Sequence, residues 1–125
     1  MTYKRKLEKD IRCPLEYGID VFGGRWKPRI LCVLADGPLR YSDLRSELVN
    51  ITDTALANAL KELQNANMVT RRQFEEIPPR VEYALTGKGK SVIPLLQAIC
   101  KWSGLFYRDV DESASGKCRR CDFVN

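Results

Sequence analysis

The chain has 125 residues and a mass of 14.3 kDa, enough for one ordinary domain, and it has no apolar run long enough to span a membrane. Its 44% hydrophobic and 30% charged residues are typical of a globular chain, and the absence of histidine excludes Ser-His-Asp and Cys-His catalysis. The 21 Lys and Arg residues exceed the 16 Asp and Glu residues, so the formal net charge is +5 and favours a polyanionic partner.

Residues 1–12 are polar and basic, and we expect them to form an arm or a frayed helix. No apolar stretch follows their positive charges, so a signal peptide is not expected. Cys13-Pro14 then begins a short amphipathic helix, because proline suits the first helical position, and Gly23-Gly24 ends it. A second helix is expected from about Trp26 to Leu34, before a Gly-Pro pair.

Two more helices are predicted in the middle of the chain. Ser42 is expected to cap a short third helix, and Thr52 to cap a fourth that runs from Asp53 to Ala66. Asn67 is expected to end the fourth helix in the left-handed conformation. Leucines recur in this helix at spacings of four and three residues, which predicts one buried face: Leu56, Leu60 and Leu63.

The hydrophobic period then changes from 3.6 to 2. Residues 69–74 and 80–85 are predicted to be two strands, joined around Pro78-Pro79. Thr86 is expected to cap a long final helix; Pro94 lies inside it and is expected to kink it or to mark a false start. One broad apolar stripe is expected on that helix: Val92, Leu95, Leu96, Ile99, Trp102, Ser103 and Phe106.

This order of elements is that of a winged helix-turn-helix. We therefore predict a mostly α, α+β fold in which residues 13–107 form one domain with a two-stranded wing and a long terminal helix. Residues 1–12 are predicted to be a basic arm before this domain. Residues 108–125 lose periodicity and are predicted to be a tail.

The helix over residues 53–66 is expected to read DNA. A helix fits the major groove, and its outward residues near the N-terminus reach the base edges. Asn58 suits a bidentate contact with adenine, Thr54 suits a thymine methyl or a phosphate, and Ala57 leaves room for close approach.

Basic and polar residues around this helix are expected to bind the DNA backbone. Lys61 and Arg45 are candidates for phosphate contacts, which fix register rather than sequence, and Ser42 offers a hydroxyl to another phosphate. Arg80, with Arg71 nearby, is expected to enter an adjacent narrow minor groove, where the negative potential is enhanced.

Each of these residues also has a plainer interpretation. Thr54 and Asn58 are compatible with a solvated helix face, since exposed positions are commonly polar. Arg71 and Arg72 are compatible with stems that cover an apolar sheet face. Asp53, in the first turn of the expected reader helix, argues against dense phosphate contact there. The combination indicates DNA binding more specifically than any single member.

Two blocks of the sequence together form a highly specific family motif: Gly-Gly-Arg-Trp-Lys at 23–27 and Pro-Pro-Arg-Val-Glu-Tyr at 78–83. They occur with a longer set of matching positions: Cys13-Pro14, Glu16, Ile30-Leu31, Gly37, Arg40–Leu44, Ile51, Leu56, Leu60, Leu63, Val69, Leu85-Thr86, Gly89, Pro94-Leu95 and Trp102. Over residues 13–103 the chain thus resembles the HxlR-type transcriptional regulators, relatives of the MarR class.

The resemblance implies a small bacterial regulator that binds a palindromic operator as a homodimer, with the first and last helices supplying the interface. Ile99, Trp102 and Phe106 are then expected in that interface, because a chain of this length has little core to hide so much aromatic surface. The alternative is that the stripe packs inside the protein.

Five cysteines without a secretion signal indicate free thiols and a reducing compartment, here the cytoplasm. The resemblance implies that Cys13 senses oxidants or electrophiles. A helix start and the neighbouring Arg12 favour its thiolate, whereas Glu16 opposes it. The alternative is a small hydrophobe at the dimer interface. Some relatives pair this cysteine with one just before the partner's reader helix, where this sequence has Val49-Asn50.

The other cysteines carry weaker signals. Cys32 and Cys100 fall on apolar helical faces and are expected to be packing residues. Cys118 and Cys121 form a C-x-x-C pair in the tail, which is half of a tetrahedral zinc site. A plain tail is expected there, with zinc shared across a dimer or a local redox switch as alternatives.

We expect no enzyme and no cofactor, because the chain also lacks a glycine-rich phosphate loop. One alternative to transcription regulation is a winged-helix protein–protein adaptor, since a fold alone does not fix function. Another is a thiol redox or zinc-binding protein that uses Cys118 and Cys121. This second alternative is disfavoured because redox C-x-x-C motifs usually begin a helix in an α/β fold.

Overall fold

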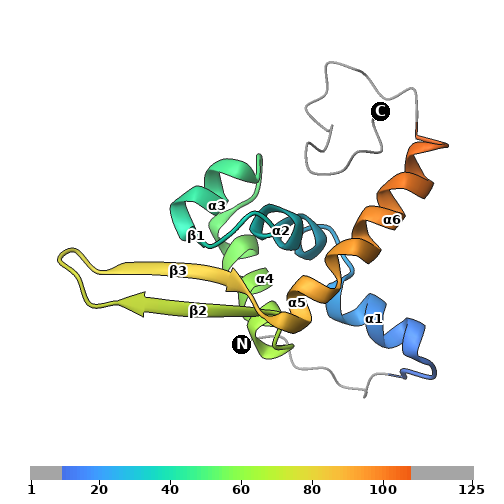
Figure 1. Cartoon of the computed structure of the whole chain (residues 1–125), viewed down its shortest axis with the longest axis horizontal. Helices are drawn as coiled ribbons and strands as arrows, with labels where there is room; N and C mark the ends of the chain where they lie inside the picture. The colour runs from blue at the N-terminus through green and yellow to red at the C-terminus, as the bar shows by residue number, and fades with distance from the viewer. Residues whose placement is uncertain (1–9, 108–125) are drawn as a thin grey trace.

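A computed structural model describes residues 10–107, which form a mostly helical α+β fold with a small antiparallel sheet (Figure 1). The predicted fold class is confirmed. The predicted tail, with Cys118 and Cys121, and the first nine residues of the predicted arm lie outside the described residues. The elements are α1 (Pro14–Phe22), α2 (Lys27–Leu34), β1 (Leu39–Arg40), α3 (Tyr41–Glu47), α4 (Asp53–Asn65), β2 (Val69–Phe74), β3 (Arg80–Leu85), α5 (Gly87–Ser91) and α6 (Ile93–Gly104).

The ends of α4 follow local signals in the sequence. Thr52 caps its start, where the Thr52 hydroxyl oxygen accepts a hydrogen bond from the backbone N–H of Ala55 at 3.0 Å. Asn67, just beyond its end, adopts the left-handed conformation with φ of 63°. Both predictions are confirmed, so the length and position of α4 are fixed by residues at its two ends.

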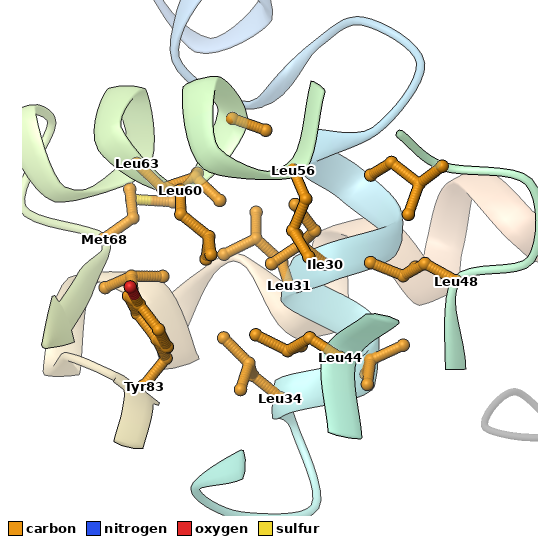
Figure 2. Packing of buried hydrophobic residues seen from close by; sticks show 14 of the residues in the cluster. Ile30, Leu31, Leu34, Leu44, Leu48, Leu56, Leu60, Leu63, Met68 and Tyr83 are labelled. Carbon is orange, nitrogen blue, oxygen red and sulfur yellow. The ribbon is translucent and has the colours of Figure 1, made fainter. Parts of the chain in front are cut away.

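The core lies between the helices of the helix-turn-helix and the base of the sheet (Figure 2). Its centre is the leucine stripe of α4, which packs against α2 and is almost wholly buried, as the spacing predicts. The buried residues labelled in Figure 2 are Ile30, Leu31, Leu34, Leu44, Leu48, Leu56, Leu60, Leu63, Met68 and Tyr83. Because α4 buries one stripe, its opposite stripe faces outward.

The wing is the hairpin of β2 and β3, which projects away from the helices in Figure 1. Its antiparallel register places Val69 opposite Leu85 and Phe74 opposite Arg80. The short β1 pairs with the other edge of β3, so the sheet has the order β1-β3-β2. The two predicted strands are confirmed, whereas β1 was not predicted because two residues cannot show an alternating pattern.

The predicted cap of α3 is wrong. Ser42 lies inside the helix, where its carbonyl oxygen accepts a hydrogen bond from the Ser46 hydroxyl at 3.1 Å. The N-cap position belongs to Arg40, whose backbone N–H donates to the Asp43 carboxylate at 3.2 Å. An acidic side chain in the first turn thus satisfies the helix start in place of a hydroxyl.

The predicted final helix is two helices. Thr86 caps the short α5 by accepting from the N–H of Gly89 at 3.0 Å. Pro94 occupies the first turn of α6, so it restarts the helix, because proline has no N–H to continue a helical ladder. The predicted stripe is divided: Val92 and Leu96 are buried, whereas Leu95, Ile99, Trp102 and Phe106 are exposed.

We predict that Leu63→Ala lowers the free energy of unfolding by about 2–5 kcal/mol, because it leaves a cavity at a fully buried position. The matched control is Ile77→Ala at the fully exposed tip of the wing, where we expect a change within about 0.5 kcal/mol. Urea denaturation of the two variants at one protein concentration gives the comparison. Equal losses would contradict this description of the core.

Candidate nucleic-acid interface

The outward stripe of α4 carries the residues predicted to read DNA. Thr54, Ala57, Asn58 and Lys61 are all exposed, on the side of the helix opposite the buried leucines. Thr54 and Asn58 are four residues apart, and Asn58 and Lys61 are three apart, so they share one face. The structure therefore brings these four residues together on an accessible helix surface, and their contact with DNA stays a prediction.

The start of α4 is fastened to α3 by a cluster of polar side chains. The Arg45 Nε atom lies 2.7 Å from Oδ1 of Asp53, and Arg45 Nη1 donates to the Ile51 carbonyl at 2.6 Å. The Tyr41 hydroxyl lies 3.3 Å from Oδ1 and from the carbonyl oxygen of Asp53. Partial burial, and then the nearby carboxylate, raise the pKa of Tyr41, so the phenol stays a protonated donor.

Sequence reasoning treated Arg45 as a phosphate contact and did not find this cluster. Tyr41 and Arg45 are four residues apart on α3, which places them on one face of that helix and was a usable signal. The spacing does not reveal Asp53 as their shared partner, because that contact depends on how the two helices pack. Ser42, also on α3, is exposed, in agreement with its predicted access to a phosphate.

The wing carries an arginine cluster around Phe74. The guanidinium carbons of Arg72 and Arg80 lie 4.8 Å and 4.0 Å from the centre of the Phe74 ring. Arg80 also lies 3.0 Å from a Glu76 carboxylate oxygen and 3.5 Å from one of Glu82. Its guanidinium is therefore turned onto the wing, and entry into a minor groove would require it to leave these partners.

Of the predicted wing contacts, Arg71 is the more accessible. It is exposed on β2, opposite Tyr83, whereas the Arg80 side chain is 28% exposed. Arg72 places its guanidinium group over the Phe74 ring, whereas the alternative interpretation had the stems of Arg71 and Arg72 covering an apolar sheet face.

A second surface, which we call the apolar face, lies on α6 and the turn that follows it, away from the tip of the wing in Figure 1. The predicted interface residues Ile99, Trp102 and Phe106 are 44%, 66% and 72% exposed, so the alternative of a buried stripe is wrong for them. Trp102 and Phe106 contact each other, with ring centroids 5.6 Å apart. Leu95, Leu105 and Tyr107 are also exposed on or just after α6, and α1 separately exposes Leu15, Tyr17 and Ile19.

Cys13 is an exposed free thiol at the N-cap position of α1. The Arg12 guanidinium, which was expected to support its thiolate, lies 2.9 Å from the Asp10 carboxylate. The Glu16 carboxylate accepts from the backbone N–H of Arg12 at 2.6 Å. Cys32 is half-buried against the core and Cys100 is half-buried on α6.

One lysine links α1, which Cys13 precedes, to the end of α4. The backbone N–H of Tyr17 donates to the Cys13 carbonyl at 3.2 Å. The ammonium of Lys88, on α5, donates both to the Tyr17 hydroxyl and to the carbonyl of Ala66, each at 2.9 Å. Because Ala66 caps the C-terminus of α4, Lys88 connects α1, α5 and α4. Sequence reasoning did not predict this link.

Residues 21–111 match the sequence model of the HxlR-like helix-turn-helix family. This chain belongs to that family. It is 43% identical over 105 residues to an uncharacterized HTH-type transcriptional regulator from Methanothermobacter thermautotrophicus, a match that covers 84% of this chain and 79% of that protein. The protein is therefore a transcriptional regulator, and the resemblance predicted from its motifs is confirmed.

Solved structures of similar proteins agree with this assignment. The redox regulator HypR in its oxidized form superimposes with a TM-score of 0.73 at 36% identity, over 78% of this chain and 100% of that one. The reduced form of the transcriptional regulator YodB from Bacillus subtilis gives a TM-score of 0.71 at 33% identity, over 81% of this chain and 100% of that one. The winged-helix fold is thus shared with known regulators.

Two further features concern only the described part of the chain. Between residues 10 and 107, no helix is long and apolar enough to cross a membrane. The same stretch has no cluster of three or more His, Cys, Asp or Glu side chains that could hold a metal ion. The pair predicted as half of a zinc site, Cys118 and Cys121, lies outside this stretch.

Proposed function

We propose that this regulator acts in the cytoplasm as a homodimer that binds a palindromic DNA operator through α4 and the wing. The observation that carries the proposal is the outward stripe of α4. There the small side chains of Thr54 and Ala57 leave room for the Asn58 amide to reach the base edges. A palindromic site suits a two-fold dimer, because each protomer then presents the same helix to one half-site.

The backbone contacts of this proposal are divided between the helices and the wing. Lys61 and Ser42 are exposed beside the reading stripe, and Arg71 is exposed on the wing. Arg45 and Arg80 each already pair with a carboxylate, so each must exchange that carboxylate for a phosphate when it binds DNA. Phosphate contacts of these kinds set the register of the protein on DNA, while Asn58 supplies the sequence preference.

The apolar face supports the homodimer. Trp102 and Phe106 are large exposed aromatic residues; Trp102 lies on α6 together with Ile99, and Phe106 lies in the turn that follows it. A contiguous exposed patch of this kind typically marks a protein–protein interface, and tryptophan is among the residues enriched at the energetic centre of interfaces. In a two-fold dimer the apolar face of one copy packs against the apolar face of the other, so both sides of the contact are apolar.

We further propose that Cys13 senses oxidants or electrophiles. Its sulfur either bonds to an electrophilic carbon with loss of the thiol proton, or is oxidised by hydrogen peroxide to the sulfenic acid with release of water. The exposed Cys13 begins α1, and the Tyr17–Lys88–Ala66 link runs from α1 to the end of α4. A displacement of α1 would therefore reach the reader helix through Lys88.

The first experiment is fluorescence anisotropy with DNA from upstream of the protein's own gene and with a scrambled duplex of the same length. A regulator that reads sequence binds the upstream DNA at physiological salt at least roughly 1,000-fold more tightly than the scrambled duplex. Equal and weak binding to both duplexes would contradict operator reading there and would favour a protein–protein adaptor.

We predict that Asn58→Ala weakens operator binding by about 5- to 150-fold for each half-site, because a bidentate contact to adenine contributes roughly 1–3 kcal/mol of discrimination. Binding to scrambled DNA should be unchanged. The matched control is Asn65→Ala, two turns further along the exposed side of α4, with a smaller effect on the operator. Anisotropy titrations decide the matter, and equal losses for the two variants would exclude Asn58 as the reading residue.

We predict that Trp102→Glu raises the dissociation constant of the dimer about thirtyfold or more, because a charge would be buried at an aromatic anchor, where losses of about 2 kcal/mol or more are typical. Sedimentation equilibrium measures this constant. Ile77→Glu, which also places a charge at an exposed apolar residue but on the wing tip, is the control. A monomeric wild-type protein at micromolar concentration would overturn the homodimer.

We predict that an oxidant releases wild-type protein from the operator but does not release Cys13→Ser. Cys100→Ser, which removes a half-buried thiol on α6 instead of the exposed thiol of Cys13, should respond like the wild type. Lys88→Met should be modified at Cys13 to the same extent, as measured by mass spectrometry, yet show reduced release. Release of Cys13→Ser equal to that of the wild type would end the sensing hypothesis.

A further inference from the structure

Asp53 places a carboxylate at the first residue of the reader helix, where DNA phosphates would approach. Its side chain is 74% exposed, although Arg45 lies against it with Nε 2.7 Å from Oδ1. The positive end of a helix dipole attracts anions, so this position would suit a phosphate of the DNA backbone. In the free protein the carboxylate of Asp53 takes that place instead.

The partner of Asp53 is one of the cations expected to bind DNA. Arg45 is 40% exposed, and its Nη1 atom is held at 2.6 Å by the Ile51 carbonyl in the turn before α4. The guanidinium therefore lies at the junction of α3 and α4 in a fixed orientation. A phosphate that binds Arg45 must displace the Asp53 carboxylate or tolerate its negative charge nearby.

We infer that Asp53 limits sequence-independent DNA binding by competing with DNA phosphates for the guanidinium of Arg45. The inference rests on the proposed function, since it assigns a role within the same DNA-binding surface. Exposed ion pairs contribute roughly 0–1 kcal/mol to stability, so this pair is weak enough to exchange with a phosphate. The Arg45–Asp53 pair instead lowers the affinity for DNA. A phosphate that must displace Asp53 from Arg45 gives a smaller net release of counterions from the DNA, and counterion release drives binding.

The test is the salt dependence of binding to a scrambled duplex, compared between the wild type and Asp53→Asn. The amide keeps the shape of the carboxylate and removes its charge. Each phosphate neutralised without competition steepens the plot of log K against log salt by about 0.9. We expect that change for each protomer, which corresponds to about eightfold tighter binding per protomer at 0.1 M monovalent salt.

Three further variants separate the inference from simpler explanations. Asp10→Asn changes the net charge equally and also removes the carboxylate partner of an arginine, Arg12, but in the segment before α1. Tyr41→Phe loosens the junction of α3 and α4 without removing the ion pair. Arg45→Met removes the cation, so Asp53→Asn added to it should leave the salt slope unchanged.

The expected result is a steeper slope and tighter binding for Asp53→Asn alone. An unchanged slope or weaker binding would overturn the inference, and so would equal steepening in Asp10→Asn, Tyr41→Phe or the double variant with Arg45→Met. Circular dichroism melting of each variant checks that the fold is kept. Operator reading is tested separately by the preference for the upstream duplex over the scrambled one. The salt slope on scrambled DNA does not depend on that preference.

Discussion

Helix α4 buries Leu56, Leu60 and Leu63 against α2, and that burial determines which way its other side chains point. A helix with one apolar stripe packed into a core must present the opposite stripe to solvent. The same packing fixes α4 relative to α3 and to the start of the wing. The orientation of the proposed reading residues Thr54 and Asn58 is therefore set by the buried leucines on the other side of the helix.

Two of the arginines near the proposed DNA surface are already paired with carboxylates. Arg45 pairs with Asp53, and Arg80 pairs with Glu76 and Glu82. The exposed Arg45–Asp53 pair contributes little to folding, whereas the Arg80 pairs are partly buried. Each carboxylate is a competitor to any phosphate that approaches its arginine. The count of 21 Lys and Arg residues thus overstates how many cations are freely offered to DNA. This arrangement favours contacts that discriminate between sequences over contacts that attract any duplex.

Much of the fold follows from periodicity and end signals, since the α4 leucines, the Thr52 cap and Asn67 are all local features. The outward stripe of α4 follows from the same periodicity. What escaped prediction depends on contacts between elements: β1 forms only because β3 is beside it, and the bridge of Lys88 joins three helices. The partner of Arg45 was missed for that reason, because helix spacing gives a direction but not the neighbour it meets.

The central claim, that two copies of α4 read two halves of one DNA site, is tested most directly by hydroxyl-radical footprinting on the upstream duplex. The account predicts two protected patches related by two-fold symmetry, with centres about one helical turn, roughly 10 base pairs, or a multiple of it apart. Asn58→Ala should weaken both patches together. A single asymmetric patch, or uniform protection along the duplex, would contradict it.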